Sequence, residues 1–192
     1  MNVYSAIQRR RTIRRFREHP IVESALIKLV DVARLAPSAG NTQPLEYITV
    51  DSKENCQALF PMLKWARFIK PDDTPPEGKR PTAYIIVLIN RDIASKGGTH
   101  DAGAAIQNIM LAALEDEIGS CWLRSIDHAG IKLLFGIPDH CEVDSVIALG
   151  KSGESPMTEA ARGDKLEYWR DERGLMHVPK RKIDQILHCE KY

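Results

Sequence analysis

The sequence predicts an α+β or α/β domain with a central sheet, and three patterns carry this prediction. The continuous apolar run 84–89 has the length and β-branched composition of a buried central strand. Residues 45–50 alternate as a second strand would. Segments 23–36 and 101–117 show helical spacing, and 23–36 is apolar on nearly every face, which is typical of a buried helix. Without an internal repeat or a low-complexity linker, residues 1–192 form a single domain.

The first half of the chain begins with a short amphipathic segment. Val3, Tyr4 and Ile7 recur at helical spacing, so a first helix is expected to deliver the arginines that follow it. Pro37 ends the helix that begins at residue 23. The segment 66–81 holds four prolines and several charges, which predicts an exposed excursion.

The long helix after the central strand is bounded by small and polar residues. Thr99 or His100 is the expected cap at its beginning, and Gly119 is expected to end it after Glu117. One side of this helix is lined by small and apolar side chains and permits close helix contact. That face comprises Ala102, Ala105, Ile106, Ile109, Ala112 and Ala113.

Two further strands are predicted at 120–126 and 143–149, with a short helix between them that Asp127 caps and Gly136 closes. The tail that follows is expected to turn at Gly174 as a short hairpin-like piece. A helix is then predicted to start near Pro179, with an apolar stripe formed by Ile183, Ile186 and Leu187.

Charge and hydropathy narrow the class of protein. The net charge is +1, which gives no global attraction to nucleic acid or to an anionic membrane. No apolar run reaches the roughly 18 residues of a membrane span, and the first residues lack the order of a signal peptide. The four cysteines are widely scattered, which favours free thiols over a disulfide framework or a zinc site. A cytoplasmic protein with no membrane or nucleic-acid partner and no bound metal is expected.

Positive charge is concentrated near the N-terminus, where six arginines lie between Arg9 and Arg17 without an acidic residue among them. Arginine suits phosphate because its planar fork donates two parallel hydrogen bonds, and Thr12 adds a hydroxyl. The cluster therefore has three interpretations, which are a phosphate site, a solvated face and a nucleic-acid arm. The third lacks an accompanying aromatic platform or recognition helix.

The loop 37–44 is rich in small, polar and turn-forming residues. It is interpreted either as a helix stop followed by an Asn/Gly turn, or as a surface whose Asn41 and Gln43 amides meet a heteroaromatic ring. Neither this loop nor the arginine segment contains a Gly-x-Gly-x-x-Gly or Gly-Lys-Ser/Thr element, so the common nucleotide cradles are missing.

The arginine segment and the loop together are similar to one known family. The stretches IQRRRTIRRF (7–16) and LAPSAGNTQP (35–44) resemble the paired N-terminal elements of the nitroreductase superfamily of FMN-dependent oxidoreductases. The resemblance continues through 101–108, 119–123 and the basic 178–182, so it spans nearly the whole chain in the right order. It implies an α+β fold with a mostly antiparallel sheet flanked by helices and a C-terminal tail that reaches onto a partner subunit.

The resemblance also implies a set of FMN-binding residues. The segment 10–12 and two tail lysines would hold the phosphate and ribityl end, and Arg14 would lie beside the pyrimidine side of the flavin. The loop would line the isoalloxazine, and the strand end 121–123 would lie near its reactive edge. The residues carried over are Arg10, Arg11, Thr12, Arg14, Pro37, Ser38, Ala39, Asn41, Cys121, Trp122, Leu123, Lys180 and Lys182.

Four positions depart from the family pattern. Thr12 stands where serine is commoner and keeps the hydroxyl, while Ala39 replaces a second serine and removes a donor. Leu45 and Glu46 replace Trp-His, so the packing after the loop must differ.

The implied activity is transfer of electrons from NAD(P)H through flavin N5 to a nitroaromatic, a quinone or a similar small acceptor, in two half-reactions. Two alternatives stay open. One is a specialised branch that dehydrogenates, dehalogenates or consumes the flavin, and the other is a non-catalytic FMN-binding or sensor protein. The family implies a homodimer with FMN at the subunit interface, and the small-residue face of the 101–117 helix is consistent with such an interface.

Other residues of chemical interest have a structural interpretation beside the functional one. His100 and Asp101 suggest a proton relay or a helix-start cap. His140 and Cys141 suggest a thiol nucleophile or a strand entry with a buried cysteine. Cys121 is either a redox thiol or a small core residue. The tryptophans stack on a flavin or serve packing, and these are Trp65, Trp122 and Trp169.

Overall fold

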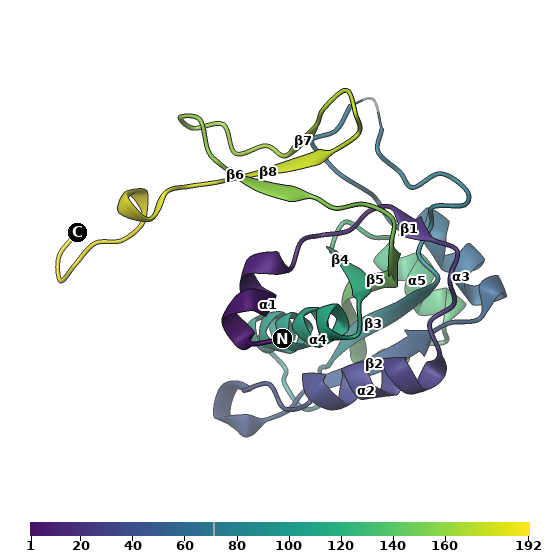
Figure 1. Cartoon of the computed structure of the whole chain (residues 1–192). Helices are drawn as coiled ribbons and strands as arrows, with labels where there is room; N and C mark the ends of the chain where they lie inside the picture. The colour runs from purple at the N-terminus through teal and green to yellow at the C-terminus, as the bar shows by residue number, and fades with distance from the viewer. Residues whose placement is uncertain (71) are drawn as a thin grey trace.

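The computed structural model describes residues 1–70 and 72–192 and has an α+β fold (Figure 1). A five-stranded antiparallel sheet with helices on both faces forms the body, and a three-stranded sheet projects from it. The mostly antiparallel sheet flanked by helices is therefore confirmed. The predicted excursion 66–81 includes position 71, which lies outside the described residues.

The first half of the chain supplies three helices and two strands of the body. Asn2 caps the first helix by accepting a hydrogen bond from the backbone of Ser5 at 2.8 Å, and this helix delivers the arginines as predicted. The second helix ends three residues earlier than the pattern suggested. The elements are α1 (Val3–Arg9), β1 (Phe16–Arg17), α2 (Glu23–Ala33), β2 (Leu45–Val50) and α3 (Lys53–Leu59).

The second half completes the body around one long strand. The elements are β3 (Ala83–Asn90), α4 (Thr99–Glu115), β4 (Ile118–Leu123), α5 (His128–Leu134) and β5 (Cys141–Ser152). Strand β5 pairs antiparallel with β1, β3 and β4, and β2 pairs with β3. Every residue of β3 is buried, which confirms the prediction of a central strand at this position.

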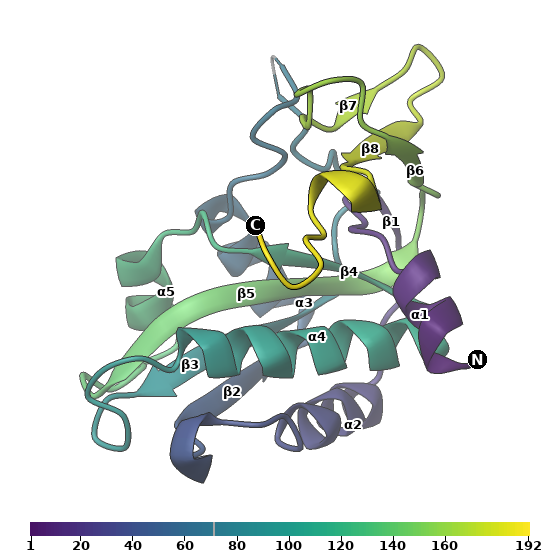
Figure 2. The same ribbon diagram turned by 90° about the vertical axis from the view of Figure 1, so that its left-hand side faces the viewer.

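Two hydrophobic cores lie on opposite faces of this sheet. Ile85 and Val87 pack with α2 and α4, whereas Tyr84 and Ile86 pack with α3 and α5. Because successive strand residues point to opposite faces, the continuous apolar run of β3 serves both cores. Figure 2 shows α4 lying along the sheet with α2 beside it.

The small-residue face of α4 is used inside the chain. Ala102, Ala105, Ile109 and Ala113 are fully buried in the core shared with α2 and the sheet. The close helix contact that this face permits is therefore made within one chain, and the face no longer supports an interface between two chains.

Both predicted boundaries of α4 are wrong. Gly98 is the N-cap residue in place of Thr99 or His100; its φ is 83°, and a Cβ there would lie 2.8 Å from Ile89 Cγ2. At the other end Glu117 makes the left-handed turn with φ of 56°, and Gly119 already belongs to β4. The cap at Asp127 is confirmed, because its Oδ1 accepts from Gly130 N at 3.0 Å.

The tail forms a second sheet from β6 (Met157–Ala160), β7 (Trp169–Arg170) and β8 (Met176–Lys180). The turn at Gly174 is confirmed, but the predicted helix at Pro179 is wrong because Pro179 lies within β8. A single 3₁₀ turn, Ile183–Gln185, follows, and its apolar side chains are exposed. The end of the chain extends away from the body (Figure 1). Among the described residues, no helix has the length and hydropathy to cross a bilayer.

Candidate functional site

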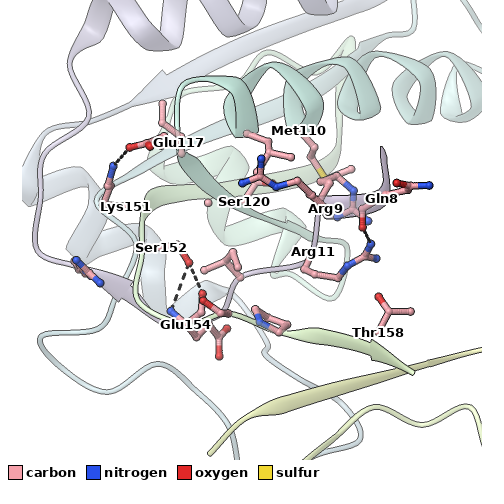
Figure 3. Close-up of a pocket in the computed structure, with 18 residues that line it drawn as sticks. Gln8, Arg9, Arg11, Met110, Glu117, Ser120, Lys151, Ser152, Glu154 and Thr158 are labelled. Atoms are coloured by element: carbon pink, nitrogen blue, oxygen red, sulfur yellow. Dashed lines mark hydrogen bonds and ion pairs between the residues drawn. The ribbon is translucent and has the colours of Figure 1, made fainter. Parts of the chain in front are cut away.

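A cavity of about 700 Å³ lies at the end of the body where α1 meets α4 (Figure 3). Its walls come from the segment 8–11, the C-terminal half of α4, the beginning of β4 and the chain that leaves β5 toward β6. Arg9, Arg10, Arg11 and Arg17 all line it. Four of the six arginines of the cluster are therefore gathered around one concave surface.

The cavity keeps much of its positive charge. Its lining carboxylate Glu117 is paired with Lys151, and its other carboxylate, Glu154, is paired with Arg170. Burial and the neighbouring Arg11 lower the pKa of Arg10, and within the described residues Arg10 has no acidic partner. An anion bound here would offset both the burial of the Arg10 charge and its repulsion by Arg11.

The arginine segment is fixed to the outer edge of β4. Ile13 N donates to Ser120 O at 2.9 Å, and Thr12 forms a parallel bridge with Ser120. Gly119 allows this approach, since a Cβ there would lie 3.0 Å from the Ile13 side chain. Alternate residues of an extended segment point to opposite sides, and Ile13 enters the core while Thr12 and Arg14 on either side of it are half-buried.

Arg14 stands apart from the cavity lining and has a distinct environment. Its guanidinium lies over the ring of Tyr168, with Cζ 4.5 Å from the ring centroid. Its Nε is buried, and within the described part of the chain it has no hydrogen-bond partner. It is one of several buried side-chain nitrogen and oxygen atoms without a partner there, and it leaves Arg14 with a donor that the described chain does not use.

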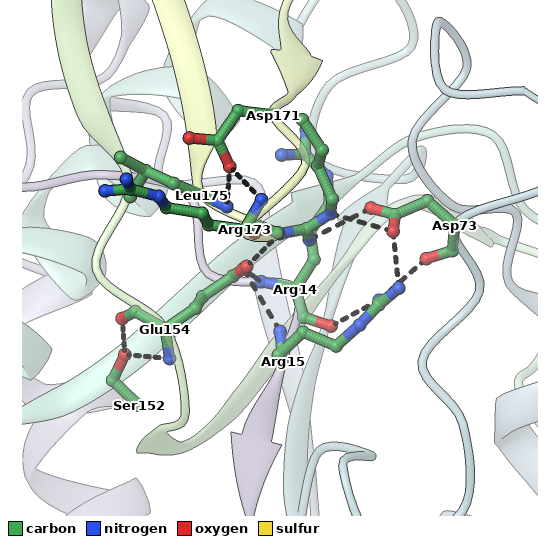
Figure 4. Close-up of polar contacts among 10 residues, drawn as sticks. Arg14, Arg15, Asp73, Ser152, Glu154, Asp171, Arg173 and Leu175 are labelled. Carbon is green, nitrogen blue, oxygen red and sulfur yellow. Dashed lines mark hydrogen bonds and ion pairs between the residues drawn. The ribbon is translucent and has the colours of Figure 1, made fainter.

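A buried ion-pair network behind Arg14 was not foreseen from the sequence (Figure 4). Glu154 Oε1 accepts hydrogen bonds from the backbone N–H groups of Arg14 and Arg15, and its Oε2 accepts from Arg170 at 2.8 Å. Asp73 binds Arg15 and accepts from Arg170 Nε at 2.9 Å. Asp73 is only 4% exposed, so the predicted excursion 66–81 is exposed only in part.

The loop 37–44 lies at the other end of α4 (Figure 2). It contains the 3₁₀ turn Ala39–Asn41, and Gly40, Asn41 and Gln43 have positive φ, which confirms the helix stop and turn. Ala39 N donates to the buried Asp101 carboxylate at 3.2 Å. Asp101 is therefore an anchor for the loop, and the helix cap predicted for the pair at 100–101 is wrong because Gly98 is the N-cap residue.

The strand residues 121–123 alternate in exposure. Cys121 and Leu123 are buried, and Trp122 is 37% exposed and reaches Gly103 of α4. Burial raises the pKa of the Cys121 thiol to about 12, so the thiol stays protonated near neutral pH and Cys121 serves as a core residue. Cys141 is likewise buried at the beginning of β5, as the strand-entry interpretation expects.

Two of the three tryptophans have packing roles. Trp65 is buried beside Phe60, with ring centroids 5.8 Å apart, and Trp169 stacks on His177 at 4.1 Å. The lysines expected to complete a phosphate site, Lys180 and Lys182, are exposed on the projecting tail and do not line the cavity in the described chain.

The fold and this cavity place the chain among α+β domains with a cationic site at the sheet edge. Residues 7–151 match the family model described as Nitroreductase family, so the chain belongs to the nitroreductase family of oxidoreductases.

Individual relatives agree with this assignment. The chain is 32% identical to a "Putative NADH dehydrogenase/NAD(P)H nitroreductase" of Methanothermobacter thermautotrophicus, over 82% of this chain and 81% of that protein. It is 25% identical to a 5,6-dimethylbenzimidazole synthase of Rhodospirillum rubrum, over 81% and 84% of the two chains. Its fold matches a Desulfovibrio desulfuricans structure described as a "putative nitroreductase in complex with fmn", with a TM-score of 0.71, 22% identity and coverage of 100% and 98%.

Proposed function

We propose that this protein is an FMN-dependent NAD(P)H oxidoreductase that reduces nitroaromatics, quinones or similar small acceptors. The observation that carries the proposal is the set of cavity-lining arginines, which have no acidic partner among the described residues, together with the Nε of Arg14, which has no partner there either. FMN, when bound, would accept a hydride from the nicotinamide at N5 and pass electrons to the acceptor.

Different residues of this chain would bind different parts of FMN. Arg10 and Arg11 line the cavity and suit a phosphate monoester, and Thr12 follows them in the chain. Arg14 presents an unused donor and a fixed positive charge, which would stabilise the negative charge that a flavin acquires near N1 on reduction. The chain therefore contributes position and charge, and the proposal assigns no side chain as an acid or base.

We further propose a homodimer in which each FMN lies between two chains. The loop contacts Asp101 while the arginine cavity is lined by Leu114, and these two positions lie about 20 Å apart along one helix. In a two-fold dimer, the loop of one chain would meet the arginine segment of the other. The exposed apolar residues of the tail, Ile183, Ile186 and Leu187, suit burial on a partner subunit, as the resemblance implies for a tail that carries Lys180 and Lys182.

The first experiment is the absorption spectrum of the purified protein, before and after reconstitution with FMN and gel filtration. The proposed enzyme is yellow, bleaches with NADH or NADPH under anaerobic conditions, and regains colour with menadione or nitrofurazone. Light scattering during gel filtration should give the mass of two chains. A protein that retains no FMN after reconstitution contradicts the proposal, and bound flavin that neither nicotinamide reduces favours the specialised flavin branch or a sensor or storage role.

A flavin-consuming enzyme is the second candidate, favoured by the similarity to a 5,6-dimethylbenzimidazole synthase. The bound flavin is reduced with NADPH, or with dithionite where NADPH does not reduce it, and is then exposed to oxygen. Chromatography of the extracted flavin separates the two candidates. Intact FMN supports the acceptor-reducing enzyme, and stoichiometric loss of FMN with a new benzimidazole product supports the second candidate.

A further inference from the structure

Arg14 and Tyr168 come from opposite ends of the chain and form the cation–π pair described above. We propose that Tyr168 is a positioning residue for Arg14 and holds its guanidinium ready to donate to the flavin. This inference rests on the proposed FMN-dependent function. Tyr168 follows the region 7–151 that matches the family model, so the family assignment itself says nothing about it.

The geometry of the pair explains how a ring can position a cation without consuming its hydrogen bonds. An aromatic ring covers one face of the planar guanidinium, while the N–H donors point outward in the plane. The Nε donor of Arg14 is unpartnered in the described chain, as this arrangement requires. A planar acceptor edge, such as the pyrimidine side of a flavin, matches donors held in this way.

Tyr168 is itself held from two sides. The ring of Phe68 packs edge-on against it, with centroids 5.3 Å apart and an interplanar angle of 69°. Two residues further along the chain, Arg170 is bound to Asp73 and Glu154. The ring therefore cannot move freely away from Arg14.

Glu154 connects both partners of the stack. One carboxylate oxygen accepts from the backbone N–H of Arg14, and the other accepts from Arg170 on the strand that follows Tyr168 (Figure 4). Glu154 thus fixes the backbone of Arg14, the ring of Tyr168 contacts its side chain, and Glu154 also holds Arg170, two residues after Tyr168. An ordered arginine loses less conformational entropy when it binds a ligand, which is the physical basis of the proposed role.

The test compares variants of the full-length protein reconstituted with FMN. Tyr168→Leu keeps apolar volume but removes the ring, and Tyr168→Phe keeps the ring. Trp169→Leu is the matched control, because Trp169 is an aromatic residue of the same segment that stacks on His177 instead. Thermal unfolding of each apoprotein reports whether it is folded. The measured quantities are the Kd of FMN and the midpoint potential of the bound flavin.

Loss of the stack should raise the Kd of FMN about threefold to tenfold, the range expected for a partly buried cation–π contact. The midpoint potential should become more negative, because a less ordered cation stabilises the reduced flavin less. Tyr168→Phe and Trp169→Leu should match the wild-type protein in both measurements. In the Arg14→Ala background, Tyr168→Leu should have no further effect on either quantity.

The outcomes separate the two proposals. Wild-type protein that binds no FMN overturns the proposed function and this inference together. FMN binding that responds to Arg14→Ala but not to Tyr168→Leu overturns the positioning role alone. Additive effects of the two substitutions also overturn it, because they show that Tyr168 acts independently of Arg14. If Tyr168→Leu does not fold, Phe68→Leu replaces it, because it removes the ring that packs against Tyr168. Phe68→Leu should then raise the Kd of FMN in the wild-type background and have no further effect in the Arg14→Ala background.

Discussion

Arg170 Nη1 donates to Glu154 Oε2 at 2.8 Å, and this ion pair joins the projecting sheet to the chain that leaves the body. Both side chains are at most 16% exposed. Arg170 also binds the buried Asp73, so one guanidinium serves two carboxylates. Burial lowers the pKa of Arg170, but the hydrogen bonds to Asp73 and Glu154 outweigh that effect and the pKa is raised.

Arg170→Met should destabilise the protein by about 3 kcal/mol, because it leaves Glu154 buried without a counter-charge and removes one partner of Asp73. Urea unfolding of the wild-type protein and the variant measures the difference. Arg34→Met is the control, since its pair with Asp31 is 64% and 56% exposed and should contribute under about 1 kcal/mol. Equal losses in the two variants would show that the buried network has no special role.

The hydrogen bond between Ala39 N and Asp101 predicts that Asp101 keeps the loop 38–43 ordered. Asp101→Ala leaves the Ala39 N–H without its partner, and amide exchange across the loop should become about tenfold faster, as expected from the loss of about 1.5 kcal/mol. Asp116→Ala, at the opposite end of α4, removes an ion pair with Lys28 and should leave exchange in the loop unchanged. Unaltered exchange in Asp101→Ala would mean that the turn holds itself through the Gln43 N–Ser38 Oγ bond.

Arg10→Ala tests the proposed phosphate site. Loss of one charge-assisted contact of about 1.5–3 kcal/mol should raise the Kd of FMN about tenfold to a hundredfold, measured by quenching of flavin fluorescence. Riboflavin lacks the phosphate, so its weaker binding should change little. Arg34→Ala, which removes an exposed arginine of α2, should bind FMN as the wild-type protein does. If FMN and riboflavin lose affinity equally, Arg10 does not contact the phosphate.

The sheet and its helices were predictable because their signals are local. Strand β3 is buried on both faces and reads as a continuous apolar run, and β2 was predicted with the bounds 45–50 that the structure gives. The turns at Gly136 and Gly174 were also marked, since both glycines have positive φ. For each of these strands and turns, the residues that determine the structure are neighbours in the sequence.

The parts that were missed depend on residues distant in the sequence. Asp73 and Arg170 are separated by 97 positions, and nothing around either residue indicates a buried pair. Glu117 makes the left-handed turn after α4, whereas a rule that places such turns at glycines selects Gly119. The anchor at Asp101 is hidden in a helix start, where an acidic residue is expected on electrostatic grounds alone. The tail differs from the prediction because Pro179 suits a helix start, whereas in the structure it lies in β8 beyond His177 and Met176, the two residues of β8 that pair with β7.

The buried thiol of Cys121 predicts how stability changes at alkaline pH. Burial raises its pKa to about 12 in the folded protein, whereas an unfolded thiol ionises near about 8.5. Between these values the unfolded chain binds fewer protons than the folded one, so stability falls as pH rises through this window. The wild-type protein should lose about 1–2 kcal/mol more than Cys121→Ala between about pH 8.5 and pH 10, because the slope approaches 1.4 kcal/mol per pH unit. Urea unfolding in a non-thiol reductant measures this difference, and the other buried ionisable groups contribute equally to both proteins.

Iodoacetamide at pH 8 is the accompanying measurement, and it should modify the exposed Cys189 while Cys56, Cys121 and Cys141 react only after unfolding. Parallel pH profiles for the two proteins, or rapid modification of Cys121 in the folded protein, would show that this thiol is accessible and would restore it as a redox candidate.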